Sequence, residues 1–376
     1  MKLLIAASVH HPEVLARFRA QQPAQSLDPI FPPSQNTYFW VKGLRQTGHE
    51  VEGFIRNQPL IGLLGARRSA RFKGLRLLER VVAVINSRVP RFNPDYAARN
   101  RRLIAHAERF HPDALLLSGG NQVIYPETLA SLKKRWGCKI VYLSGVSPIV
   151  FSNALERAAA PLYDLVVVND FYHGVQWLEL GAKQMEALPL SACDPEFHQP
   201  ANLTPEEQHA FGCDIGFVGT LVPENLYRDR VEALRVVRDL GLGVWSIHGI
   251  PPELKENYRG EALGETMLRV LCGSKIQINP HGTFMRYGGN MRLFEAAACG
   301  VFQIADDLPG VRKWFEVGQT IEVYHDPAHL RAQVIYYLQH EDERAAIAHA
   351  AREHVLKHHT YDQRMRALGE LIAALK

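Results

Sequence analysis

Two charged side chains on one short predicted helix have the spacing and the chemistry to hold a nucleotide. Arg292 and Glu295 stand three residues apart, which places them on the same helix face. Asn290 is a favoured N-cap residue, and Gly288 and Gly289 let the backbone approach a ligand closely. An arginine at a helix N-terminus favours phosphate, and a glutamate one turn later can accept two hydrogen bonds from ribose hydroxyls. The alternative is an ordinary surface ion pair.

The segments that must position this helix have the pattern of buried strands. Residues 274–279 and 301–304 are largely apolar runs on either side of it, and Gly300 suits the left-handed position that follows a helix. Phe294, Ala297 and Ala298 form a second, apolar helix face. The sequence therefore predicts a strand, a glycine-containing loop, a helix that packs by one face, and another strand.

The order of motifs in the second half resembles that of GT-B glycosyltransferases. Residues 290–300, which read N-x-R-L-F-E-A-x-A-C-G, are similar to the donor-site helix of these enzymes. The CgeB-like, spore-maturation-type branch also shows a strand that ends in F-V-G, an S-K-I-x-x-N strand and a C-terminal H-T-Y-x-x-R, which stand here at 217–219, 274–279 and 359–364. The resemblance covers roughly the second half of the chain, while residues 1–110 match only in general pattern.

The resemblance implies an α/β protein of GT-B architecture, with two doubly wound, Rossmann-like parallel sheets facing a cleft and a C-terminal helix that crosses back to the first domain. It implies transfer of a sugar from a nucleoside-diphosphate sugar, with UDP as the expected nucleotide and no cofactor. Negative charge builds on the departing diphosphate, so fixed positive charge is the largest contribution that the protein can make. The expected catalytic residues are Arg230, Arg292 and Glu295. The expected donor-binding residues are Gly219, Thr220, Arg228, His248, Gly249, Asn279, His281, Gly289 and Asn290.

Two departures from the family pattern bear on the reaction. Retaining members of the large family carry a second glutamate eight residues before the ribose-binding one, where this chain has Tyr287, so retention is not inferred. An acidic turn common in CgeB-like proteins is replaced by residues 144–148. An inverting enzyme needs a general base near its acceptor, and the candidates are His10, His11 and Asp170.

The acceptor side and the question of a metal rest on weaker signals. Gly120 and Asn121 follow an apolar strand and are expected to line the acceptor side, with a plain tight turn as the alternative. Asp306 and Asp307 are adjacent acids after a strand, without a third ligand nearby in sequence, and are read as solvated turn residues. The sequence thus predicts a metal-independent reaction.

Composition indicates how many domains the chain can form and in which cellular compartment it is expected. The chain has 376 residues, of which 47% are hydrophobic, enough for two ordinary domains. Its five cysteines include no C-x-x-C pair, which favours a reducing cytoplasm over a disulfide framework. Residues 1–9 are read as a first buried strand and not as a signal peptide. No apolar run approaches the ~20 residues that span a bilayer, so a membrane contact would be peripheral, at the inner face.

Short apolar runs alternate with amphipathic stretches along the chain, which predicts parallel sheets with helical crossovers. The expected strands are 3–9, 51–55, 114–118, 139–143, 165–168 and 184–188, then 215–218, 244–248, 276–279, 301–304 and 321–324. The expected domains are an acceptor-binding domain at 1–190, a linker at 191–212, a nucleotide-sugar-binding domain at 213–358 and a crossing helix at 359–376.

A basic segment interrupts the first predicted domain. Residues 56–102 hold twelve Arg or Lys against Glu79 and Asp95, a net of +10. Within it, 67–89 has a helical pattern with one apolar stripe, and Arg67, Arg68 and Arg71 are the expected acceptor contacts. This arm either packs on its own domain or contacts anionic lipid or a polyanionic acceptor, nucleic acid included.

Two other functions compete with glycosyl transfer. A nucleotide-sugar epimerase or hydrolase on the same scaffold would need no acceptor other than water. An inactive GT-B module that binds a polyanion or assembles a surface coat would bind without turnover. Fold analogy alone does not separate these.

Reversing the arm's charge tests its role. We expect Arg67→Glu, Arg68→Glu and Arg71→Glu together to weaken acceptor use strongly at low salt and little at high salt, because attraction to an anionic surface is screened over a Debye length of ~8 Å at physiological salt. Donor affinity should not change. Full acceptor kinetics at low salt would show that the arm is only a packed surface helix.

Overall fold

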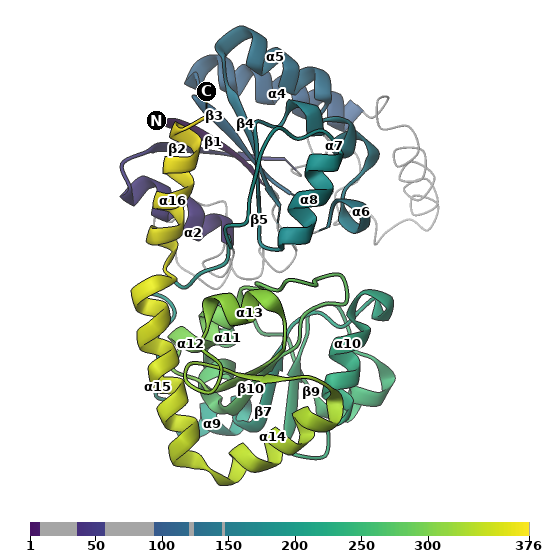
Figure 1. The fold of residues 1–376 in the computed structure, drawn as a ribbon, viewed down its shortest axis with the longest axis vertical. Coiled ribbons are helices and arrows are strands. Elements are labelled where there is room, and N and C mark those ends of the chain that lie inside the picture. The colour runs from purple at the N-terminus through teal and green to yellow at the C-terminus, as the bar shows by residue number, and fades with distance from the viewer. Residues whose placement is uncertain (8–35, 57–93, 120–123, 145–146, 376) are drawn as a thin grey trace, which may run out of the picture.

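The computed structural model describes residues 1–7, 36–56, 94–119, 124–144 and 147–375 (Figure 1). Several predicted acceptor-side features lie outside these ranges, and their assignments stay predictions. They are His10, His11, Arg67, Arg68, Arg71, Gly120, Asn121 and the helix at 67–89.

The N-terminal half is built on a six-stranded parallel sheet with the order β2-β1-β3-β4-β5-β6. The strands are β1 (Lys2–Ala7), β2 (Glu50–Ile55), β3 (Ala114–Ser118), β4 (Lys139–Ser144), β5 (Leu165–Val168) and β6 (Met185–Glu186). The connecting helices are α2 (Asn36–Gln46), α4 (Pro94–Phe110), α5 (Pro126–Trp136), α6 (Pro148–Phe151), α7 (Ala154–Ala158) and α8 (Phe171–Glu179), with a 3-10 turn at Ala160–Leu162. Strands β1, β3, β4 and β5 are buried almost throughout, as expected for a sheet covered on both faces.

The C-terminal half repeats this plan with the order β12-β11-β10-β7-β8-β9, again all parallel. Its strands are β7 (Cys213–Val218), β8 (Leu242–Trp245), β9 (Tyr258–Gly260), β10 (Ser274–Asn279), β11 (Gln303–Asp306) and β12 (Glu322–Tyr324). Its helices are α9 (Pro205–Phe211), α10 (Glu224–Arg235), α11 (Glu265–Gly273), α12 (Arg292–Ala298), α13 (Pro309–Trp314), α14 (Pro327–Gln339), α15 (Glu341–His358) and α16 (Tyr361–Ala373), with a 3-10 turn at Pro252–Asn257. The predicted α/β class with two doubly wound parallel sheets is confirmed.

Strand boundaries differ from the predicted ones where the apolar pattern is ambiguous. Strand β8 ends at Trp245, three residues before the expected end at His248. The residues at the carboxyl end of this strand are therefore Ser246 and Ile247, and not those that follow His248. Strand β9 has three residues and no strong apolar run, and sequence reasoning missed it. Both differences lie next to the candidate site described below.

The C-terminal helices join the two halves (Figure 1). Helix α15 lies against α12, and α16 packs on α2 in the N-terminal half. The side chains of Met365 and Leu368 are fully buried in the core that contains Leu3 and Leu44. The predicted crossing of the final helix is confirmed.

The chain passes between the halves at two places that are hydrogen-bonded to each other. The N–H of Cys193 donates to the carbonyl of His359 at 2.9 Å, and the N–H of Tyr361 donates to the carbonyl of Cys193 at 2.9 Å. The predicted linker at 191–212 also contains α9, which Glu207 ties to Arg269 of α11 at 2.6 Å. The linker is therefore partly a structural element of the C-terminal half.

His359 fixes the bend between α15 and α16. Its Nε2 contacts the carbonyl of Trp314 at 3.1 Å, and its Nδ1 accepts a hydrogen bond from Arg364. Burial, together with the charges of Arg364 and of His354 if protonated, lowers the pKa of His359 to about 3. The ring is thus held neutral in the folded protein at any ordinary pH.

This lowered pKa predicts a loss of stability on mild acidification. Between about pH 6.5 and 3 the unfolded chain binds a proton that folded His359 does not, so acidification favours unfolding by up to about 1.4 kcal/mol per pH unit. We expect the stability advantage of the wild type over His359→Gln to shrink as pH falls from 7.5 to 5 in urea titrations. The control is His349→Gln, because His349 is exposed on α15, the helix that ends just before His359. A pH-independent difference would contradict the assignment.

Candidate functional site

A pocket of about 420 Å³ lies between the halves, at the carboxyl ends of β7, β8 and β10. In doubly wound folds this edge of the sheet is where ligands bind. The C-terminal half contributes Phe217, Val218, Gly219, Thr220, Arg230, Trp245, Ser246, Ile247, Ala262, Leu263, Ile278, Asn279, Pro280, Phe284, Met285, Asn290, Met291 and Arg292. The N-terminal half contributes Asn36, Asn169 and Ser191. Among these described lining residues the charged ones are both arginines, so the pocket favours an anion.

Arg230 is held in place by backbone carbonyls. Its Nε donates to Pro280 at 2.9 Å and its Nη1 to Thr220 at 3.0 Å, while its guanidinium lies 4.9 Å from the ring centre of Tyr227. Burial lowers the pKa of Arg230, but an arginine keeps its charge at neutral pH. The positive charge therefore stands at the pocket wall without needing to reorganise when an anion arrives.

Arg292 and Glu295 form the predicted i,i+3 pair, but the pair is not on the surface. Nη1 of Arg292 lies 2.6 Å from Oε2 of Glu295, and Glu295 is fully buried. The second oxygen, Oε1, lies 3.6 Å from Nε2 of His198, which is also fully buried. Burial alone would raise the pKa of Glu295. The charge of Arg292 and the contact with His198 outweigh the effect of burial, so the pKa of Glu295 is lowered.

This arrangement corrects both interpretations of the pair. Arg292 lines the pocket, whereas Glu295 does not, and one of its oxygens is already used by the arginine. The surface-pair alternative is wrong because the pair is enclosed. The structure does not present Glu295 to a ribose, and this role stays a prediction that would require Arg292 to move.

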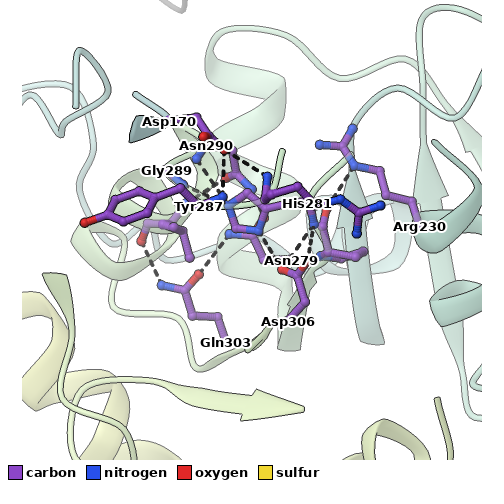
Figure 2. A network of polar contacts seen from close by, with 12 residues as sticks. Asp170, Arg230, Asn279, His281, Tyr287, Gly289, Asn290, Gln303 and Asp306 are labelled. Carbon is purple, nitrogen blue, oxygen red and sulfur yellow. Dashed lines mark hydrogen bonds and ion pairs between the residues drawn. The ribbon is translucent and has the colours of Figure 1, made fainter. Parts of the chain in front are cut away.

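His281 contacts the loop before α12 (Figure 2) and is not among the residues that line the pocket. Its Nδ1 lies 2.5 Å from Oδ1 of Asp306, and its Nε2 accepts hydrogen bonds from the N–H groups of Gly289 at 3.1 Å and Asn290 at 3.3 Å. Both ring nitrogens are thus used, and the predicted contact of His281 with the donor is not available. The N–H of Gly289 donates to His281 and is likewise not available to a donor. Gly289 has φ 106°, and a Cβ there would lie 2.6 Å from Trp314, so only glycine fits.

The side-chain amides of Asn290, Asn279 and Gln303 are hydrogen-bonded in a row (Figure 2). Nδ2 of Asn290 donates to Oδ1 of Asn279 at 2.9 Å, Nδ2 of Asn279 contacts Oε1 of Gln303 at 3.4 Å, and Nε2 of Gln303 donates to the carbonyl of Leu293 at 2.7 Å. Oδ1 of Asn290 accepts from the N–H of Leu293 at 3.3 Å, although the N-cap position of α12 is Met291 and not Asn290 as predicted. Asn279 and Asn290 therefore line the pocket and also hold α12 in place, and their contact with a donor stays a prediction.

Asp170 connects the two halves (Figure 2). Its Oδ2 accepts hydrogen bonds from the N–H groups of Arg286 at 2.9 Å and Tyr287 at 2.7 Å, and its Oδ1 caps α8 through the N–H of Tyr172 at 3.0 Å. The carboxylate is nearly completely buried. Asp170 is therefore a structural residue, and the interpretation as a general base is wrong.

The adjacent acids after β11 are both engaged with nearby cations or histidines. Asp306 bonds to His281, and Asp307 pairs with Arg312 at 2.5 Å and with His325 at 2.9 Å. The sequence suggested that Asp306 and Asp307 are plain solvated turn residues, and these contacts show that they are not. In the part of the chain that the structure describes, no group of three or more His, Cys, Asp or Glu side chains has a geometry that could hold a metal ion.

The remaining predicted donor residues divide between the pocket and the surface. Gly219 and Thr220 line the pocket, although the N–H of Gly219 donates to the carbonyl of Trp245. Arg228, His248 and Gly249 are exposed and do not line it. Their predicted roles have no support in this arrangement.

Sequence reasoning missed three groups of lining residues. Ser246 and Ile247 line the pocket where His248 was expected, because β8 ends earlier than its apolar pattern suggests. Ala262 and Leu263 follow the missed strand β9 and carry no motif. Asn36, Asn169 and Ser191 come from the N-terminal half, and the only usable signal was the position of Asn169 at the end of the β5 strand run.

Comparisons with known proteins agree with this geometry. Residues 228–370 match a family described as glycosyl transferase-like. No curated protein sequence is detectably similar to the chain. Among solved structures, sucrose-phosphate synthase from Thermosynechococcus elongatus superposes with a TM-score of 0.63 at 13% identity, covering 100% of this chain and 99% of that chain. Anabaena HepE in complex with UDP and glucose superposes with a TM-score of 0.60 at 14% identity, covering 100% of both chains.

A third similar structure belongs to another enzyme class. It is a putative UDP-N-acetylglucosamine 2-epimerase from Listeria monocytogenes, with a TM-score of 0.51 at 12% identity, covering 98% of this chain and 94% of that chain. These likenesses show the GT-B fold, and residues 228–370 are similar to a glycosyl transferase-like family. The CgeB-like branch is a finer assignment that none of them names.

The buried pair makes Glu295 a stability determinant. Removing one partner of a buried charge pair costs about 3–5 kcal/mol, because the other partner keeps an uncompensated charge, and the cost is at the lower end here because Arg292 lines the pocket, where water can solvate it. We expect the urea midpoint of Glu295→Ala to fall accordingly. Glu265→Ala, on an exposed helix face, is the control. An unchanged midpoint for Glu295→Ala would show that the pair is not enclosed in solution.

Proposed function

We propose that this protein is a metal-independent glycosyltransferase that moves a sugar from a nucleoside-diphosphate sugar, with UDP as the nucleotide, to an acceptor bound by the N-terminal half. The observation that carries the proposal is the pocket between two Rossmann-like sheets, which places Arg230 and Arg292 at the carboxyl ends of the strands without an acid among its described lining residues.

The two arginines match the charge that develops in this reaction. The departing diphosphate gains negative charge in the transition state, and fixed positive groups that face it lower the barrier. Arg230 is oriented by two carbonyls, and Arg292 is oriented by Glu295 and by Sδ of Met267 at 2.6 Å. This supports a reaction in which arginines do the work that a divalent cation does in metal-dependent transferases.

The side of the pocket formed at the ends of β8 and β9 suits a nucleoside base. Trp245, Ile247 and Leu263 are apolar lining residues there, next to Ser246 and Ala262. Uracil is our proposed base, since Anabaena HepE has been solved in complexes with UDP and with UDP-glucose. The donor sugar would then lie toward Asn36, Asn169 and Ser191.

The acceptor and the cellular location follow from the sequence and are part of the proposal. We place the acceptor against the N-terminal half, where His10 and His11 are the sequence's candidates for a base and Gly120 and Asn121 for contacts. The net charge of +10 in residues 56–102 favours an anionic acceptor or membrane surface. The protein would act in the cytoplasm, within the CgeB-like branch.

An epimerase is the second candidate, because one similar structure is described as a putative UDP-N-acetylglucosamine 2-epimerase. An epimerase or hydrolase would consume the donor without any acceptor other than water. An inactive binding module would bind UDP without consuming the sugar donor. Donor consumption with and without acceptor preparations therefore separates the three.

Donor recognition is tested by binding UDP, GDP, ADP and dTDP in calorimetry. We expect UDP to bind most tightly, and we expect Arg292→Gln with Glu295→Gln to weaken it about ten- to a hundredfold relative to Glu295→Gln alone, since a charge-assisted hydrogen bond contributes about 1.5–3 kcal/mol. The double change removes both charges of the buried pair. Arg366→Gln, at an exposed position of α16, is the control.

Donor turnover should also persist in EDTA, because the proposed reaction uses no metal ion. Loss of turnover in EDTA, with rescue by Mn²⁺, would contradict the proposal.

A further inference from the structure

Six exposed hydrophobic side chains gather on two neighbouring helices of the N-terminal half. Ile149, which is 69% exposed, and Val150 belong to α6. Phe171, Tyr172, Val175 and Leu178 belong to α8, and Tyr172 is 49% exposed. We call these six side chains the α6–α8 face. The large exposed hydrophobic residues elsewhere in the described part of the chain lie singly or in pairs on other elements.

Helix α8 is apolar on both of its sides. Gly174 and Trp177 face the core and are buried, while Phe171, Val175 and Leu178, spaced as i, i+4 and i+7, share the outer side. The only Asp, Glu, Lys or Arg within the helix is Glu179 at its last position. A helix of this composition is normally covered on its outer side as well, so an exposed face of this kind marks an interaction surface.

The two helices form one surface, which continues to the mouth of the pocket. Oγ of Ser147, at the start of α6, lies 3.3 Å from Oε1 of Gln176 on α8. The ring of Phe151 at the end of α6 lies 4.8 Å from that of Phe284, which lines the pocket. The ring of Tyr172 lies 6.2 Å from that of Tyr287, on the same loop as Phe284. A molecule bound on this face would therefore reach the cleft.

The charges next to this face are two arginines and, at the end of α8, the exposed Glu179. Arg286, between Phe284 and Tyr287, is exposed, and Arg157 is half-buried beside α6, where it donates to the carbonyl of Ser152 at 2.8 Å. Aromatic and aliphatic side chains beside arginines are the composition of helices that lie in the headgroup region of an anionic membrane. No helix in the described ranges is long and apolar enough to cross a bilayer.

We propose that the α6–α8 face docks on the surface of a bilayer that contains anionic phospholipid, with α8 lying in the headgroup region and the pocket mouth turned toward the membrane. The acceptor would then be an amphiphile whose apolar part stays in the membrane while its polar part enters the cleft. This second statement rests on the proposed transferase function, whereas the docking itself does not.

Cosedimentation of the full chain with vesicles tests the docking, using phosphatidylcholine alone and phosphatidylcholine with 30% phosphatidylglycerol as the two arms. We expect the chain to bind the anionic vesicles, and we expect Ile149→Ser with Tyr172→Ser to lower the partition coefficient about tenfold, since both side chains lose apolar area that the bilayer would cover. The matched control changes the same two residue types on α14, Ile335→Ser with Tyr336→Ser, which are 41% and 43% exposed. The control should bind as the wild type does.

UDP calorimetry on both variants keeps docking separate from donor binding, because neither pair lines the pocket. Unchanged UDP affinity with lost vesicle binding supports the proposal. It is overturned if the wild type does not sediment with anionic vesicles, or if the two double variants bind equally. It is also overturned if light scattering shows a dimer that only Ile149→Ser with Tyr172→Ser dissociates, because the face would then be an interface between two copies.

Discussion

The pocket depends on one buried carboxylate. Asp170 begins α8 in the N-terminal half, and its hydrogen bonds to the N–H groups of Arg286 and Tyr287 hold a loop of the C-terminal half against it. His173, one turn along α8, adds a contact of 3.1 Å between its Nε2 and the carbonyl of Phe284. Charge-assisted bonds to backbone donors are among the stronger hydrogen bonds in proteins, and burial strengthens them further. Without Asp170 the loop would lose the two hydrogen bonds that tie its Arg286 and Tyr287 backbone to the N-terminal half.

The same loop is fixed from its other side by His281. Because Asp306 contacts Nδ1, Nε2 is left to accept the N–H groups of Gly289 and Asn290, and the backbone that leads into α12 is set by this ring. Arg292 follows two residues later, and its guanidinium is oriented by Glu295. The positive charge in the pocket thus results from a series of contacts that begin in the other half. Such preorganisation is what electrostatic catalysis requires.

The sequence predicted the sheets and the position of α12, because buried strands and a capped helix with an apolar face leave periodic patterns. It did not predict the burial of Glu295, since a spacing of three residues places two side chains on one face without saying what covers that face. The covering residue, His198, is far away in the chain. His248 was placed at the site instead of Ile247 because the strand was expected to run to residue 248, whereas β8 ends at Trp245. Asn36 and Ser191 reach the pocket only through the packing of one half on the other, and no local pattern encodes such a contact.

The paired crossing of the chain at Cys193 and Thr360 limits how the two halves can move. Two covalent connections that lie side by side and are hydrogen-bonded act as an axis: they allow rotation about a line through themselves and resist twisting and sliding. Displacement then grows with distance from this axis. It is smallest where α15 meets α16 and larger at the pocket and at the loop that Asp170 holds. Opening and closing would therefore follow a single path, with the donor pocket widening as the contact at Asp170 separates.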